Sequence, residues 1–526
     1  QGYLQQYRLH NQTAEFLLFN DLLLPVPFNS CQTGPVIDMP VPASFNDITQ
    51  DPHLENYIGW VWYEKEVLLP QRWLQDDLST RVVLRFGSAH YYSIVWVNGV
   101  QVVEHEGGHL PFEADISRIV QRSPGVPCRI TVALNNTLTL HTLPPGSIQY
   151  MNDKTRYPKN YFVQNTRFDF FNYAGIHRPV VLYTTPSVYI DDITVTTTSS
   201  ESVAMVQYQI SVVGSELYSL SLSLRDQEGK VVATGDGPSG ELKVPNPNLW
   251  WPYLMHENPG YRYFLEVKMQ AQANGVPQED IYTLPVGIRT VHVTSTQFLI
   301  NGKPFYFHGV NKHEDADIRG KGLDWALIVK DFNLLRWLGA NSFRTSHYPY
   351  AEEIMDLCDT YGIVVIDECP GAPYVDVICV NSYFSWYHDS GHLEVIPLQL
   401  TAQFENWYKT YQKPIIQSEY GADSVPGLHS DPPAMFSEEY QKAMLKEYHS
   451  VFDKKRKEYV VGELIWNFAD FMTNQGITRV LGNKKGIFTR QRQPKSAAFV
   501  LRERYWKIAN ESSCLPPIIK SHILFL

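Results

Sequence analysis

Two acidic residues of this chain stand at the ends of short apolar runs. Glu419 follows the run at residues 414–418 and comes just before Gly421. A buried strand that carries an acid at its C-terminal end is how barrel enzymes present catalytic groups. Glu368 ends a second run, at residues 363–367. A lone carboxylate there is more often a structural partner of a nearby base than a general acid, because proton transfer requires close reach.

The composition is that of a globular chain with several domains. Of its 526 residues, 44% are hydrophobic and 19% are charged, and this length allows about two to four domains. The net charge of −11 argues against nucleic acid or an anionic membrane as a partner, because both are bound through clustered Lys and Arg. No run approaches the ~18 consecutive apolar residues of a membrane-spanning helix.

The chain shows no motif for a cofactor or a metal. It has no Gly-rich phosphate loop, no dinucleotide fingerprint and no metal-ligand spacing, so we expect neither kind of group. Its cysteines form no CxxC pair, and we expect them to be buried free thiols. They are Cys31, Cys128, Cys358, Cys369, Cys379 and Cys514.

The first half of the chain reads as all-β. From about residue 36 to residue 188, short alternating or apolar segments recur between turn signals, which predicts strands. Asn98-Gly99 predicts a type I′ hairpin, since both residues tolerate positive φ. We therefore expect a jelly-roll β-sandwich over residues 1–188. A second strand series, over residues 189–290, suits an immunoglobulin-like β-sandwich.

After Lys303, strands alternate with helices. One helix is predicted to begin after Asp324 as its N-cap and to end at Gly339. Such alternation predicts a parallel sheet. Its size and the carboxylates at its strand ends favour a (β/α)₈ barrel over residues 291–526.

The predicted barrel lacks two of its eight units. The strand that ends near Glu368 and the next one, at residues 374–380, are separated by only about six residues. Parallel neighbours need a crossover of a dozen or more residues. Strands at residues 415–417 and 462–466 bring the number to six. Two missing units amount to roughly 60–80 residues of a ~250-residue barrel.

A dense set of segments places the chain near a known family. These segments are Asp38-Met39-Pro40-Val41-Pro42, Phe168-Asp169-Phe170-Phe171-Asn172-Tyr173-Ala174-Gly175, Phe307-His308-Gly309-Val310-Asn311-Lys312-His313-Glu314-Asp315 and Gln417-Ser418-Glu419-Tyr420-Gly421. Together they resemble the β-glucuronidases of glycoside hydrolase family 2, over about residues 33–507. Residues 1–32 and 510–526 depart from the family pattern.

The resemblance also identifies what is missing. In the family, the fourth barrel strand ends in an Asn-Glu-Pro tripeptide whose Glu is the general acid/base. No Asn-Glu-Pro occurs in this chain, and Gly371-Ala372-Pro373 looks like the join across the omission. A retaining glycosidase uses two carboxyl groups about 5 Å apart. The resemblance supplies only one of them.

The resemblance assigns roles residue by residue. It implies that Glu419 is the nucleophile and that Tyr383 hydrogen-bonds it; without the resemblance, Tyr383 would as readily be a packing residue. As lone residues, an Asp or a His in the remaining positions would more often be structural. Contacts with the substrate are implied for Asp169, His347, Trp466 and Asn467, and contacts with its C6 carboxylate for Asn483, Lys485 and Arg490.

Two functions of different classes follow. The first is a retaining exo-β-glucuronidase that removes terminal β-D-glucuronic acid from glycosaminoglycans, such as dermatan- and keratan-type chains, and from glucuronide conjugates. The second is a catalytically deficient relative that binds glucuronides or is a structural remnant, because the Asn-Glu-Pro segment is absent. In either case the resemblance implies that the folded chain forms a homotetramer, as the family does.

A lysosomal location is implied by the family alone. The chain begins at Gln1, without a basic or an apolar leader region, so we expect that any signal peptide has been removed or never belonged to this stretch of sequence. Asn11, Asn135 and Asn510 begin Asn-x-Ser/Thr triplets, which are compatible with a secretory route and glycosylation although such triplets arise often by chance.

Overall fold

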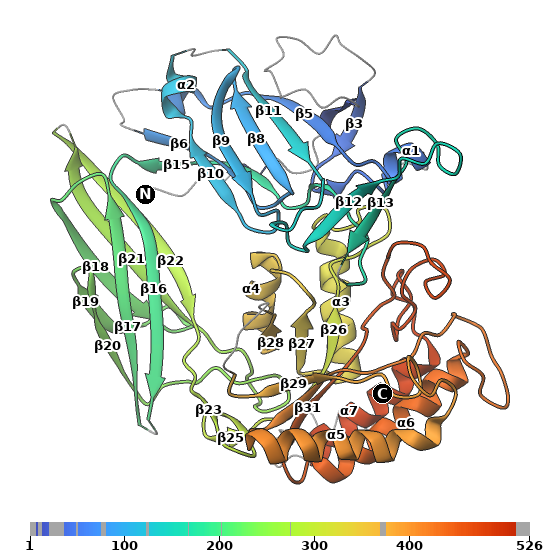
Figure 1. The fold of residues 1–526 in the computed structure, drawn as a ribbon. Helices are drawn as coiled ribbons and strands as arrows, with labels where there is room; N and C mark the ends of the chain where they lie inside the picture. The colour runs from blue at the N-terminus through green and yellow to red at the C-terminus, as the bar shows by residue number, and fades with distance from the viewer. Residues whose placement is uncertain are drawn as a thin grey trace.

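The computed structural model describes residues 7–8, 13–19, 36–48, 51–74, 80–122, 126–166, 168–200, 202–273, 275–368 and 375–511. It has three parts, which confirms the expected order of two β-sandwiches followed by an α/β domain. In Figure 1 the α/β part, in yellow to red, lies below the first sandwich, and the second sandwich, in green, lies beside both. Asn11, the join at residues 371–373, and Cys31, Cys369 and Cys514 lie outside the described residues.

The first sandwich buries an apolar core between two antiparallel sheets. Its elements are β1 (Tyr7–Arg8), β2 (Thr13–Phe19), β3 (Ile37–Pro40), β4 (Ala43–Ser44), α1 (Pro52–Glu55), β5 (Trp60–Val67), η1 (Gln71–Leu74), β6 (Thr80–Phe86), β7 (Ala89–His90), β8 (Tyr92–Val97), β9 (Val100–Glu106), β10 (Phe112–Asp115), α2 (Ser117–Gln121), β11 (Cys128–Asn135), β12 (Gly146–Tyr150), β13 (Phe162–Thr166), β14 (Gly175–Ile176) and β15 (Val180–Pro186). One sheet has the order β1-β15-β6-β10 and the other β3-β2-β5-β11-β8-β9.

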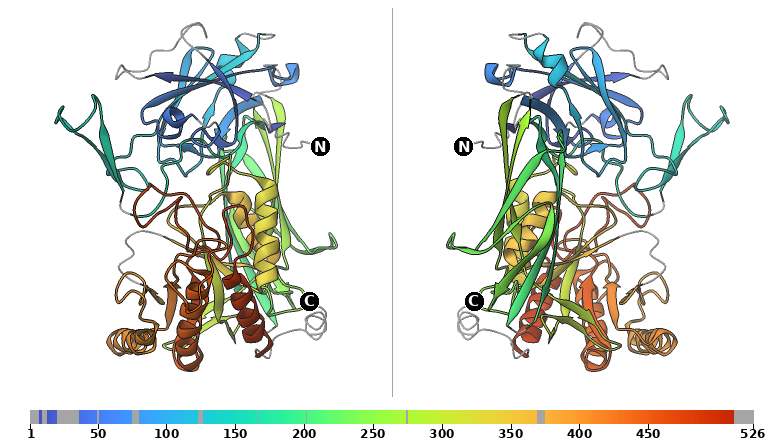
Figure 2. Two further views of the ribbon diagram at one scale, coloured as in Figure 1. Left: turned by 90° about the vertical axis from the view of Figure 1, so that its right-hand side faces the viewer. Right: turned by 90° about the vertical axis from the view of Figure 1, so that its left-hand side faces the viewer.

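The hairpin predicted at Asn98-Gly99 joins β8 to β9. Asn98 has a φ of 50° and Gly99 a φ of 78°, as a type I′ turn requires. A second hairpin, β12–β13, projects from the sandwich and is seen in teal in Figure 2. Of the two predicted glycosylation sites that the structure describes, Asn135 is half-buried at the end of β11 and Asn510 is exposed near the end of the last helix.

The second sandwich also consists of two antiparallel sheets around its own core. Its strands are β16 (Tyr189–Ser199), β17 (Val203–Val213), β18 (Tyr218–Arg225), β19 (Val231–Asp236), β20 (Ser239–Pro245), β21 (Tyr263–Ala273) and β22 (Val276–Val286). They form the sheets β16-β17-β20 and β19-β18-β21-β22. A small sheet of β23 (Val291–Val293), β24 (Phe298–Ile300) and β25 (Lys303–Pro304) leads into the α/β domain.

The α/β domain is a curled parallel sheet with helices on its outer side. Its elements are β26 (Phe307–Lys312), α3 (Trp325–Leu338), β27 (Ser342–Thr345), α4 (Glu352–Tyr361), β28 (Val364–Asp367), β29 (Ile378–Asn381), η3 (Leu393–Val395), α5 (Ile396–Tyr411), β30 (Ile415–Glu419), α6 (Glu438–Lys455), β31 (Val460–Ile465) and α7 (Ser496–Glu511). Within the described chain, no helix combines the length and the apolar character that crossing a bilayer requires.

Local signals account for the ends of the first helix. Asp324 caps α3 by accepting hydrogen bonds from the backbone N–H groups of Ala326 and Leu327, as an N-cap residue does. Gly339 ends α3 with a φ of 75°, which costs glycine least. The predicted helix is therefore confirmed at both ends, and it sets β26 and β27 as parallel neighbours.

The sheet is an open arc rather than a closed barrel. Its order is β28-β27-β26-β31-β30-β29, so β28 and β29 are its two edges among the described strands. This arrangement confirms the inference from the short connection that these two strands cannot be neighbours. An eight-stranded barrel would need two further strands between them.

The open arc corrects one expectation about the cysteines. Cys128 and Cys358 are buried, but Cys379 on β29 is exposed. Its neighbours Ile378 and Val380 face the helices and belong to the main core, whereas Cys379 lies on the opposite face of the strand. In a closed barrel that face is packed by other strands. Here the edge position of β29 leaves it uncovered.

We expect Cys379 to react with iodoacetamide in the native protein at least tenfold faster than Cys128 and Cys358. The two buried thiols are internal controls, because reagent access to them requires local opening. Timed alkylation followed by peptide mapping measures all three. Protection of Cys379 equal to that of Cys358 would contradict the open arc.

Candidate active site

Glu419 is the last residue of β30, and two donors hold its carboxylate. Oε1 accepts a hydrogen bond of 2.8 Å from Nη1 of Arg344, and Oε2 accepts one of 2.6 Å from the hydroxyl of Tyr383. The Glu419 side chain is only 8% exposed. A carboxylate that is fixed through both oxygens keeps one orientation, as a nucleophile requires. The structure thus brings the predicted pair, Glu419 and Tyr383, together.

Tyr383 is fixed as a hydrogen-bond donor. Burial, and after it the charge of Glu419, raises the pKa of Tyr383 well above its usual value, so the phenol keeps its proton. The backbone around it is also held. Ser382 donates from its N–H to the Glu419 carbonyl at 2.9 Å, and the Tyr448 hydroxyl donates to the Ser382 carbonyl at 3.0 Å.

Arg344 at the end of β27 joins two carboxylates. Its Nη1 contacts Glu419, and its Nη2 lies 2.7 Å from Oε2 of Glu368. The same Glu368 oxygen is 2.9 Å from Nδ1 of His347. Burial alone would lower the pKa of Arg344, but the charges of Glu419 and Glu368 raise it overall. Burial likewise acts to raise the pKa of Glu368, yet His347 and Arg344 bring it below its usual value.

Lys485 lies close to Glu419 and is separated from it by the rings of Tyr383 and Tyr387. Its side chain is fully buried, and Nζ contacts the Asp423 carboxylate and lies 3.0 Å from the Tyr387 hydroxyl. The ammonium is also 5.7 Å from the centre of the Tyr383 ring. Since the Tyr383 and Tyr387 rings are 5.1 Å apart, one tyrosine pair links the nucleophile to the buried cation.

Arg479 is a second cation at this place, and the sequence analysis missed it. Its Nη2 donates to the Tyr387 hydroxyl at 2.8 Å, and its Nε donates to Oδ2 of Asp169 at 2.6 Å. Asn483 reaches the same Asp169 oxygen at 3.3 Å. Asp169 belongs to the first sandwich, so the two domains meet here. No spacing marks Arg479 in the sequence, and only its position in space reveals it.

The remaining predicted residues surround Trp466, which follows β31. Its ring stacks on His347, with centroids 5.1 Å apart and planes at 22°. Asn467 is fully buried, and its Nδ2 has no hydrogen-bond partner among the described residues. A buried donor without a partner is rare, and at a functional site it points to a ligand or water.

Arg490 lies in an ion-pair network of its own. Its Nη2 is 2.7 Å from Asp47 of the first sandwich, its Nε is 2.5 Å from Asp315, and its Nη1 is 3.2 Å from Asp317. All three nitrogens are therefore engaged. That Arg490 binds substrate stays a prediction, and its contacts favour a role in joining the sandwich to the barrel.

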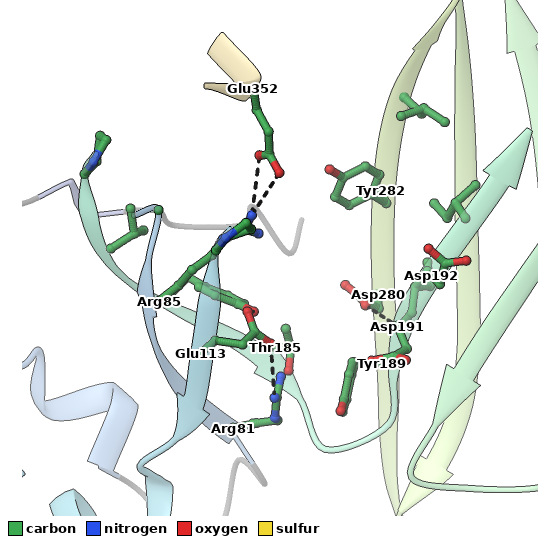
Figure 3. A pocket seen from close by; sticks show the side chains of 18 of the residues that line it. Arg81, Arg85, Glu113, Thr185, Tyr189, Asp191, Asp192, Asp280, Tyr282 and Glu352 are labelled. Carbon is green, nitrogen blue, oxygen red and sulfur yellow. Dashed lines mark hydrogen bonds and ion pairs between the residues drawn. The ribbon is translucent and has the colours of Figure 1, made fainter. Parts of the chain in front are cut away.

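A separate pocket of about 540 Å³ lies where the three domains meet (Figure 3). None of the predicted site residues lines it. One wall carries Arg85 of β6, which pairs with Glu352 of α4 at 3.1 Å, and another carries Tyr282 of β22. Because α4 leads into β28, the pair joins the first sandwich to the unit that precedes Glu368.

The arrangement supports nucleophilic chemistry by a carboxylate beside a cationic pocket. An oriented Glu419 lies next to an aromatic wall and two cations, the buried Lys485 and the half-buried Arg479. In the described part of the chain, no group of three or more His, Cys, Asp and Glu side chains could hold a metal ion.

Replacing Arg344 by Met should lower the free energy of unfolding by about 3–5 kcal/mol, because two carboxylates would lose their buried partner. Arg85→Met, which breaks a pair that is 35% and 75% exposed, is the matched control. It should cost less than about 1 kcal/mol. Urea denaturation of both variants measures the difference, and equal stabilities would contradict the bridging role of Arg344.

Comparisons with known proteins agree with this geometry. The model of the "Glycosyl hydrolases family 2, TIM barrel domain" matches residues 291–373 and 371–510, the model of the "sugar binding domain" of the same family matches residues 25–186, and the "Glycosyl hydrolases family 2" model matches residues 188–289. The β-glucuronidases of Felis catus and Homo sapiens are each 61% identical to this chain, over 94% of it and 88% of the relative.

Solved structures give the same result. A β-D-glucuronidase of Dictyoglomus thermophilum superposes with a TM-score of 0.87 at 42% identity, over 98% of this chain and 99% of that one. A β-glucuronidase of an uncultured Clostridium has a TM-score of 0.84 at 39% identity, over 96% and 98% of the two chains. Three matched domains, close relatives and a shared fold lead to one conclusion: the chain belongs to glycosyl hydrolase family 2, among its β-glucuronidases.

Proposed function

We propose that the chain is a retaining exo-β-glucuronidase whose nucleophile is Glu419. The observation that carries the proposal is the position of Glu419, held by Arg344 and Tyr383 and separated from Lys485 by one pair of tyrosine rings. In this mechanism the Glu419 carboxylate attacks the anomeric carbon and forms a glucuronyl ester, and water then cleaves that ester.

The recognition of glucuronic acid rests on donors that converge. Lys485 Nζ and Arg479 Nη2 both donate to the Tyr387 hydroxyl, at 3.0 and 2.8 Å. The two cations thus lie side by side at this hydroxyl, and the C6 carboxylate is proposed to bind next to it, since ammonium and guanidinium groups bind carboxylates through charge-assisted hydrogen bonds. Asn483 adds an amide beside them. A glucoside has no charge to place there.

The sugar hydroxyls are proposed to contact polar and aromatic side chains that the fold already positions. Asp169 reaches the site from the first sandwich, and His347 stacks on Trp466. The unpartnered Nδ2 of Asn467 supplies a buried donor close to the ring floor. These residues orient the sugar so that its anomeric carbon faces Glu419, and such positioning raises the rate of attack.

We also infer that the chain lacks the barrel units that would carry the Asn-Glu-Pro acid. The barrel model matches in two segments that meet at residues 371–373, and the described sheet has six strands. Loss of acid/base assistance alone typically costs ~10²–10⁴ in rate. Substrates with good leaving groups should therefore be cleaved best.

The wider setting is proposed from the family. Terminal glucuronic acid of glycosaminoglycans, including dermatan- and keratan-type chains, and glucuronide conjugates are the proposed substrates. We propose a lysosomal homotetramer that is glycosylated at Asn135 and Asn510, both of which begin sequons.

Incubation with 2-deoxy-2-fluoro-glucuronyl fluoride should add one glucuronyl group to the intact mass. That leaving group needs little protonation, and the 2-fluorine slows hydrolysis of the ester, so the adduct accumulates on Glu419. Intact-mass measurement and peptide mapping locate it.

Glu419→Gln is the matched control and should give no adduct. The corresponding glucosyl fluoride, which lacks the carboxylate, should react far more slowly with the unmodified chain. No adduct on soluble, folded protein would contradict the proposal and support the catalytically deficient alternative.

A further inference from the structure

We propose that Glu368 is the second catalytic carboxylate of this chain and activates water in the hydrolysis of the glucuronyl ester. The inference rests on the proposed function of Glu419. In the balanced step, the water oxygen bonds to the anomeric carbon, the bond from that carbon to Glu419 breaks and returns its electron pair to the carboxylate, and the water proton passes to Glu368. Glu368 then releases the proton to solvent or to the leaving oxygen of the next substrate.

The guanidinium of Arg344 sets the distance between the two acids. Glu419 lies 2.8 Å from Nη1 and Glu368 lies 2.7 Å from Nη2. Two carboxylates on neighbouring nitrogens of one rigid guanidinium are held close but not in contact. Retaining glycosidases keep their two carboxyl groups about 5 Å apart, a separation that this bridge allows.

The backbone of Glu368 is also fixed. Its N–H donates to the Thr345 hydroxyl at 3.1 Å, and that hydroxyl donates to Oδ1 of Asp367 at 2.7 Å. His347 holds Oε2 at 2.9 Å while stacking on Trp466. The carboxylate is therefore tied to the ring that is proposed to lie beneath the sugar.

The Glu368 side chain is more exposed to solvent than that of the nucleophile, Glu419. Its side chain is 27% exposed, against 8% for Glu419, because it follows the edge strand β28. Both Arg344 and His347 contact Oε2, and no hydrogen bond to Oε1 is found among the described residues. One oxygen is thus positioned by the protein, and we propose that the other binds the attacking water.

The local charges suit a base better than an acid. His347 and Arg344 hold the pKa of Glu368 below its usual value despite burial, so the residue is ionised at neutral pH. Esterification of Glu419 would remove its negative charge and leave Arg344 to Glu368, which keeps Glu368 ionised when a base is needed. Protonation of a poor leaving group would become effective only as the pH falls.

A purely structural Glu368 would behave differently. As an ion-pair partner of Arg344 it would affect stability and the orientation of Glu419, and its loss would slow both steps alike. As a base it affects the second step alone when the leaving group needs no proton. The two roles therefore separate in a kinetic experiment.

The test compares the native chain with Glu368→Gln on 2,4-dinitrophenyl β-D-glucuronide. We expect a burst of about one equivalent of dinitrophenol, a kcat lowered ~10²–10⁴-fold and a nearly unchanged kcat/KM, because only ester hydrolysis loses its base. Sodium azide should restore turnover and yield β-glucuronyl azide, since an anionic nucleophile needs no base. Glu394→Gln, which changes a carboxylate that is 73% exposed and pairs with His392, is the matched control and should show none of these changes.

Three results would overturn the proposal. They are an unchanged kcat in Glu368→Gln, an equal loss in kcat and kcat/KM without azide rescue, and the absence of any glucuronyl adduct in the native chain, which would also remove the proposed function. If the variant does not fold, the native chain decides. Its ester hydrolysis rate should rise with pH to a plateau, and a flat profile would contradict a base.

Discussion

The ion pair of Arg344 with Glu419 is the interaction on which the active site depends. A buried charge must be paired, because its removal from water costs several kcal/mol. Asn311 extends the pair, since its Oδ1 accepts from Arg344 at 2.8 Å and its Nδ2 donates to the carbonyls of Ser418 and Ile465. Four strands, β26, β27, β30 and β31, are joined at their carboxyl ends by this network.

The network lies in the interior of the open sheet. Strands β26, β27, β30 and β31 each have a neighbour on both sides, and β28 and β29 are the edges among the strands that the structure describes. The nucleophile and its main partner are therefore held by complete strand pairing. The gap between β28 and β29 affects the two edge strands, where Glu368 and Cys379 lie. This division explains how an open sheet of six described strands can keep an oriented nucleophile.

Local signals in the sequence predicted much of the fold. The cap at Asp324, the end of the helix at Gly339 and the turn at Asn98-Gly99 act through neighbouring residues, so one sequence suffices to find them. The six strands followed from the apolar runs, and the break between the third and the fourth followed from the length of one connection. The expected burial of Cys379 was wrong, because burial depends on strands that are not adjacent in the chain.

The candidate site was predictable only in part. Glu419 was found from its position at a strand end, and the other roles came from the resemblance. Arg479 and Tyr387 were missed, because long loops bring them to Lys485 and no spacing marks them. Arg490 shows the opposite case, since a cation next to a motif can have all its nitrogens engaged elsewhere. Whether such a cation can bind substrate depends on the side chains that surround it in the folded protein.

A crystal structure of this chain with D-glucaro-1,5-lactone would test the account most directly. We predict that the lactone ring lies against Trp466, with its C1 carbonyl carbon, which takes the place of the anomeric carbon, facing Glu419 and its carboxylate at Lys485 and Arg479. A lactone bound elsewhere, or Arg344 separated from Glu419, would contradict the claim that six strands assemble the site.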